Sequence, residues 1–149
     1  MELRHLLTVK LTTLDGALLA ASDIIVHRSL LILIDAYRAK PERLAAEIGW
    51  VQERLDEEID LVLIWPGHAV DQARMIQPGH STRMFLDSIG EFRRLVSTTG
   101  NRRAVLVTPE TGTIERISGM SPVFAVRHHH DGIDDRRADR TIDLGDVYH

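Results

Sequence analysis

The chain alternates between short runs of consecutive apolar residues and segments in which apolar residues recur every three or four positions. The runs 61–65 and 104–108 are rich in Val, Leu and Ile, and each is followed by a proline. Such runs predict strands that are buried on both faces. Residues 5–35 are also expected to be extended and to form a hairpin. A helix over 28–39 is the alternative, because periodicity does not distinguish helix from strand in a short apolar run.

Two segments have the apolar spacing of a helix that packs one face against a core. The first begins at Pro41, since proline at the first helical position loses no hydrogen bond, and its stripe is Leu44, Ile48, Val51 and Leu55. The second is capped by Ser81 and ends at Gly100, and its stripe is Phe85, Ile89, Phe92 and Val96. Strands mixed with two helices predict an α/β fold, namely a single domain with a mixed central sheet flanked by helices.

The composition fits one globular domain and excludes several kinds of chemistry. The chain has 149 residues, of which 44% are hydrophobic and 27% charged, and its formal net charge is −4. It contains no cysteine, which excludes a disulfide scaffold, thiol catalysis and a zinc site built on thiolates. The charge is modestly acidic and only 5% of residues are aromatic, so no nucleic-acid partner is expected.

The apolar runs are also too short to span a bilayer, which takes roughly 20 residues, and the chain begins without a signal-peptide pattern. We therefore expect no membrane association and a cytoplasmic location. Residues 131–149 are polar and rich in Asp and Arg, so they predict a tail that follows a domain over 1–130.

Two acidic turns could carry chemistry. In Asp15-Gly16-Ala17 the glycine would let the backbone approach a ligand, and the carboxylate could hold a metal or a ribose hydroxyl. Glu110 follows the strand 104–108 and could reach a metal or a nucleotide. The alternatives are a plain turn between strands at the first position and a solvated hairpin tip at the second.

Two further segments contain residue types that bind anions or metals. In 78–83 the glycine, two hydroxyls and Arg83 at an expected helix start are suited to a phosphate, although Ser81 is also an ordinary cap. The run His128-His129-His130-Asp131 could bind a divalent metal through two imidazoles on one face of a strand. A surface run beside a polar tail is the favoured alternative there.

Together, these motifs resemble the diadenylate cyclase domain of DisA-type proteins. That family opens with Asp-Gly-Ala and a hairpin, as at Asp15-Gly16-Ala17. Its Gly-Thr-Arg-His-Arg type motif is similar to Gly79-His-Ser-Thr-Arg83, and its Glu-Glu-Thr-Gly strand end is similar to Pro109-Glu-Thr-Gly112. Residues 41–65 would then be an insertion between the first two motifs.

The resemblance implies a site for ATP. Asp15 would be the catalytic residue and the ligand of Mg or Mn, with Gly16 and Ala17 beside the nucleotide. Gly79, Ser81, Thr82 and Arg83 would bind the triphosphate, and Glu110 would lie near it. A face-to-face homo-oligomer would synthesise cyclic di-AMP from two ATP, each 3′-hydroxyl attacking the other's α-phosphate. Because Met84-Phe85 replaces the family's His-Arg, we expect nucleotide binding in preference to turnover.

A second resemblance has a different functional implication. The expected order of elements is similar to that of a STAS domain, the fold of anti-sigma-factor antagonists, whose partner is a protein. Ser81 would then be the phosphorylated switch residue at a helix start. The two resemblances differ at residues 113–117, which should be a returning strand in a cyclase and a helix in a STAS domain.

Overall fold

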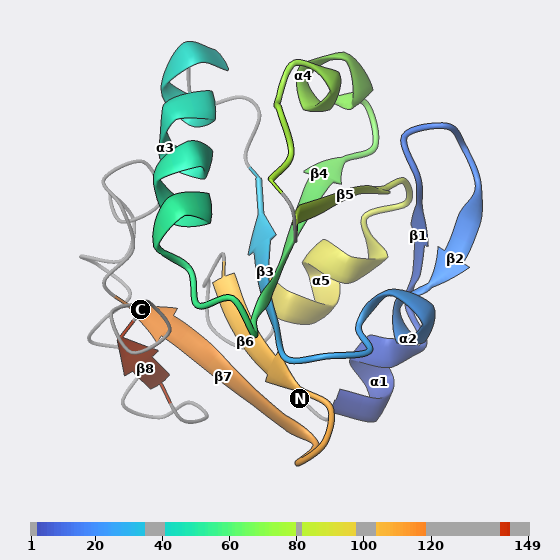
Figure 1. Ribbon diagram of the computed structural model, residues 1–149. Coiled ribbons are helices and arrows are strands. Elements are labelled where there is room, and N and C mark those ends of the chain that lie inside the picture. The colour runs from blue at the N-terminus through green and yellow to red at the C-terminus, as the bar shows by residue number, and fades with distance from the viewer. Residues whose placement is uncertain (1–2, 35–40, 80–81, 98–103, 119–140, 144–149) are drawn as a thin grey trace.

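Strand β3 (Ser29–Leu33) lies near the middle of a mixed eight-stranded sheet whose order is β2-β1-β5-β4-β3-β6-β7-β8 (Figure 1). The computed structural model describes residues 3–34, 41–79, 82–97, 104–118 and 141–143. The other strands are β1 (Lys10–Thr12), β2 (Leu18–Ala20), β4 (Asp60–Pro66), β5 (Thr82–Asp87), β6 (Ala104–Thr108), β7 (Thr113–Ser118) and β8 (Thr141–Asp143). Strands β3, β4 and β5 are mutually parallel, whereas β6 runs antiparallel to β3 and β1 antiparallel to β5. The predicted α/β domain with a mixed sheet is confirmed.

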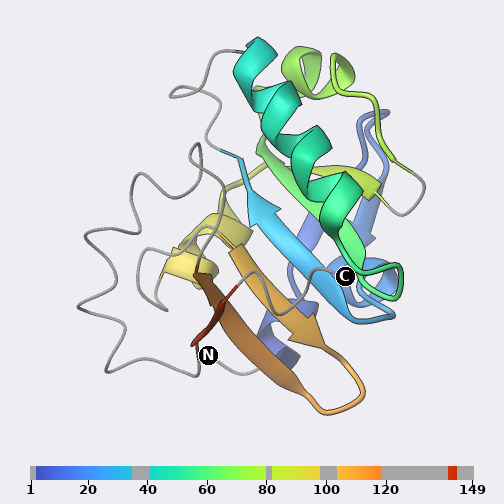
Figure 2. The same cartoon turned by 60° about the vertical axis from the view of Figure 1, so that its left-hand side comes forward.

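Helices cover both faces of the sheet (Figures 1 and 2). Helices α3 (Pro41–Arg54) and α4 (Val70–Arg74) pack on one face. Helices α1 (Leu3–Leu7), α2 (Ala21–Ile24) and α5 (Glu91–Ser97) pack on the other. No helix within the described ranges has the length and apolar character needed to cross a membrane.

Strand β4 contributes side chains to both cores. Leu61, Leu63 and Trp65 belong to the core under α3 and α4, and Val62 and Ile64 to the core on the opposite face. All five are buried, because successive side chains of a strand point to opposite faces and here both faces are covered. The continuous apolar run that predicts this strand is therefore explained by its central position.

The segment 81–97 differs from its prediction as a single helix. Residues 82–87 form strand β5, and the helix begins only at Glu91. Ile89, part of the predicted stripe, lies in the turn between them and is 66% exposed. The four apolar residues of the predicted stripe therefore lie in three different places, namely the end of a strand, a turn and a short helix.

Two segments that the sequence sets apart from the core, the expected insertion and the expected tail, contain strands of the sheet. Residues 41–65, expected as an insertion, supply α3 and nearly all of the central strand β4. From the segment expected as a tail, residues 141–143 form β8, which pairs parallel to β7. The run His128-His129-His130 lies outside the described residues.

Candidate functional site

The Asp15-Gly16-Ala17 motif forms the turn between β1 and β2. Gly16 has φ +99°, a conformation that favours glycine, and its amide donates to Thr13 O at 3.0 Å. The Ala17 amide donates to Thr13 Oγ1 at 2.9 Å. Asp15, Gly16 and Ala17 are all exposed. The motif is thus accounted for by the requirements of a tight turn.

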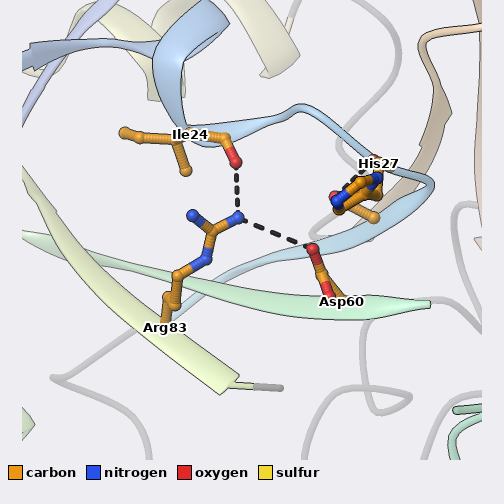
Figure 3. Close-up of polar contacts among 5 residues, drawn as sticks. Ile24, His27, Asp60 and Arg83 are labelled. Atoms are coloured by element: carbon orange, nitrogen blue, oxygen red, sulfur yellow. Dashed lines mark hydrogen bonds and ion pairs between the residues drawn. The ribbon is translucent and has the colours of Figure 1, made fainter. Parts of the chain in front are cut away.

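Arg83 makes intramolecular contacts at the amino ends of the parallel strands (Figure 3). Its Nη2 donates to the Ile24 carbonyl oxygen at the end of α2, and it lies 3.7 Å from Oδ2 of Asp60 at the start of β4. Arg83 therefore joins three elements of the fold, namely α2, β4 and β5.

The remaining residues of the expected phosphate motif are near the surface. The Gly79 amide donates to Oε1 of Gln52 on α3, and Thr82 is partly buried at the start of β5. Ser81 lies outside the described residues. Thr82 and Arg83 lie in strand β5. The helix start expected at this motif is therefore not found at these two residues.

Glu110 lies at a different part of the surface, in the turn between β6 and β7. It is exposed and lines a polar hollow of about 290 Å³ at the amino ends of β3 and β4, together with His27, Arg28, Asp56, Glu58 and Ile59. Across the described ranges, no three His, Asp or Glu side chains gather as a metal site would require.

The structure does not bring the expected residues together. The β1–β2 turn with Asp15 and the β6–β7 turn with Glu110 lie at opposite ends of the molecule in both views (Figures 1 and 2). Arg83 is engaged with Asp60 and Ile24, so it is not directed at either turn.

An apolar pocket of about 200 Å³ lies at the carboxyl end of β4, between the start of α3 and helix α4. Figures 1 and 2 show these two helical segments side by side beyond the ends of β3 and β4. The crevice at the carboxyl ends of parallel strands is the usual place for ligands in open α/β sheets. The lining residues are Glu42, Leu44, Ala45, Trp65, Gln72, Met75 and Ile76.

Two residues in the wall of this pocket carry unpaired polar atoms. Nε1 of Trp65 and Oε1 of Gln72 are buried, and neither has a hydrogen-bond partner among the residues that the structure describes. Trp65 has no exposed surface, whereas Gln72 is partly exposed. Leaving a buried donor or acceptor unsatisfied costs about 1–3 kcal/mol, so such atoms are uncommon and need an explanation.

The sequence interpretation missed this pocket. The run 61–65 was predicted as a buried strand, and the one available signal was a tryptophan at its end, since a buried indole N–H usually requires a partner. Gln72 and Met75 fall in the segment 66–80. This segment contains too few regularly spaced apolar residues to predict which face of a helix is buried.

Comparisons with known proteins identify the fold. No family model matches the chain, and no curated protein matches it. Among solved structures, DsbF of MTB, in mixed oxidised and reduced forms, is 16% identical, with a TM-score of 0.59 over 89% of this chain and 93% of that one. A secreted Mycobacterium tuberculosis disulfide oxidoreductase homologous to E. coli DsbE is 14% identical, with a TM-score of 0.52 over 85% of this chain and 92% of that one.

These neighbours correct the predicted function. The resemblance to diadenylate cyclases is wrong, and so are the ATP binding and cyclic di-AMP synthesis inferred from it. The STAS alternative is wrong as well, and residues 113–117 are in a strand where it requires a helix. The divalent metal (Mg or Mn), the homo-oligomer and the anti-sigma partner followed from these resemblances and remain untested. The chain has a thioredoxin-like fold.

Proposed function

We propose that the chain is a binding domain for a small organic molecule, held in the pocket between α3 and α4, and that it performs no thiol chemistry. The proposal is supported mainly by two residues that line an otherwise apolar pocket and whose buried polar atoms have no hydrogen-bond partner among the described residues. A few polar groups in a mostly apolar concave site are typical of ligand sites.

The chemistry named for the structural neighbours does not transfer to this chain. Thiol–disulfide exchange proceeds by attack of a thiolate on a disulfide sulfur. The chain has no cysteine, so neither the attacking thiolate nor a disulfide can form within it. At 14–16% identity, the likeness to the two oxidoreductases concerns the fold alone. One fold can carry different functions, so we look for a function other than thiol chemistry.

The size and position of the pocket support a ligand with one ring. An apolar cavity of about 150 Å³ in another protein holds benzene, so a cavity of about 200 Å³ is large enough for a ring with a small substituent. Met75 is 67% exposed and lies at the pocket, so ligand burial would also cover apolar surface that water now contacts.

Calorimetric titration with toluene tests the proposal. Ala45 lines the pocket and Ala46 does not, yet both are exposed on the same turn of α3. We expect toluene to bind the native protein and Ala46→Trp alike. Ala45→Trp should bind it at least about tenfold more weakly, because the indole occupies the pocket. Equal binding by both variants, or none by the native protein, would refute the proposal.

The compartment that we propose is the cytoplasm. A chain without cysteine contains none of the disulfides that form and persist in oxidising compartments. Fractionation of cells that produce the tagged protein tests this, and recovery in the secreted fraction would contradict it.

A further inference from the structure

We infer that the pocket selects uncharged ligands that carry a carboxamide, with a carbonyl acceptor and an adjacent N–H donor on an apolar ring. This inference rests on the proposed binding function and adds the chemical class of the ligand. It follows from the two unpaired atoms, the charges around the pocket and the position of Gln72.

The two unpaired atoms have opposite hydrogen-bonding roles. The indole Nε1 of Trp65 can only donate, and Oε1 of Gln72 can only accept. A ligand that satisfies both must present one acceptor and one donor, and a carboxamide has these on two atoms bonded to the same carbon. A ketone would satisfy only Trp65, and a hydrocarbon would satisfy neither.

The charge at the pocket disfavours carboxylate ligands. Among the described residues that line the pocket, Glu42 alone is ionisable, and it is exposed in the first turn of α3. The described lining residues thus include no cation that would offset the desolvation of a buried carboxylate, which is costly without a partner. An uncharged amide has nearly the shape of a carboxylate without that cost.

Contact between a ligand and the two unpaired atoms requires a movement of the Gln72 side chain, because both atoms are now buried. Gln72 is partly exposed and lies on the five-residue helix α4, outside the sheet. In the bound state its Oε1 accepts from the ligand amide, and the ligand carbonyl accepts from Nε1 of Trp65. Both groups then gain the partners that they lack in the free protein.

A series of ring compounds of similar size tests this selection. Toluene offers no polar group, acetophenone an acceptor, benzamide an acceptor and a donor, and benzoate a negative charge. We expect the dissociation constant from calorimetry to fall from toluene through acetophenone to benzamide, and benzoate to bind more weakly than benzamide. The variant Gln72→Met removes the acceptor while retaining a side chain of similar length.

For Gln72→Met we expect the preference for benzamide over toluene to shrink about fivefold to tenfold, the effect of one hydrogen bond, with toluene affinity nearly unchanged. If toluene binds but benzamide binds no better, or benzoate binds as well as benzamide, the carboxamide inference is wrong while the proposed function stands. An undiminished preference in Gln72→Met also contradicts it. Failure of all four compounds to bind overturns the proposed function as well.

Discussion

Arg83 is the residue that the expected phosphate site depended on most, and its contacts give it a structural role. Its guanidinium joins the end of α2 to the start of β4 through the Ile24 carbonyl and the Asp60 carboxylate. Side chains of both ion-pair partners are partly exposed, 40% for Arg83 and 23% for Asp60, so solvent weakens their attraction. The hydrogen bond from a charged donor to a backbone carbonyl is therefore the larger contribution.

Replacement of this residue should affect stability and leave ligand binding intact. We expect Arg83→Met to lower the free energy of unfolding by about 1 kcal/mol in urea titrations. Arg43, exposed on α3, provides the control, and Arg43→Met should change the unfolding free energy by less than about 0.5 kcal/mol. Equal stability of the two variants would show that the contacts of Arg83 contribute nothing.

At the level of the elements, two glycines differ in the space around them, although the sequence does not distinguish them. A Cβ on Gly67 would lie 2.8 Å from the Cα of Ser88, so the connection after β4 passes directly against the turn that follows β5. A Cβ on Gly49, inside α3, would have no heavy atom within 4 Å. Only the first glycine is needed for close packing.

Alanine at these two positions should change stability in opposite directions. Gly67→Ala forces two backbone segments apart, and we expect a loss of at least about 1–3 kcal/mol. Gly49→Ala removes the entropic penalty of glycine in a helix and should raise the free energy of unfolding by about 0.5–1 kcal/mol. Chemical denaturation measures both, and a stable Gly67→Ala would mean that the two connections are not in contact.

The start of α5 depends on Asp87, the last residue of β5. Its Oδ1 accepts from the Phe92 amide at 3.0 Å and its Oδ2 from the Arg93 amide at 2.9 Å. We expect Asp87→Ala to cost about 1–2 kcal/mol of unfolding free energy, because two helix amides lose their acceptors. Asp87→Asn keeps one acceptor and should lose less. Equal losses for the two variants would contradict this capping role.

This helix start also shows why the sequence predicted some elements and missed others. Runs of Val, Leu and Ile in 61–65 and 104–108 identify strands, because burial on both faces leaves no polar positions. Between Phe85 and Val96 the apolar spacing is helical by coincidence. Gly90, with φ +71°, lies in the turn between β5 and α5, and sequence spacing does not reveal that conformation.

At the level of the whole molecule, the parallel arrangement of β3, β4 and β5 creates two different ends. The amino ends carry the Arg83 contacts and the polar hollow beside Glu110, and the carboxyl end of β4 carries the apolar pocket. The pocket could not be predicted from the sequence. The sequence offers only the tryptophan at the end of a buried strand, and the structure alone shows that neither Trp65 nor Gln72 has a partner for its buried polar atom among the described residues.

The central claim is that this pocket binds a small molecule, and the indole N–H of Trp65 is its most direct reporter. The protein has two tryptophans, so the Trp50→Phe variant assigns the Trp65 signal in ¹H–¹⁵N spectra. Titration with benzamide should shift this signal and the amides at the start of α3 and in α4 along one saturable curve, which Ala45→Trp abolishes. Shifts that do not saturate, or that leave the Trp65 indole unchanged, would contradict the account.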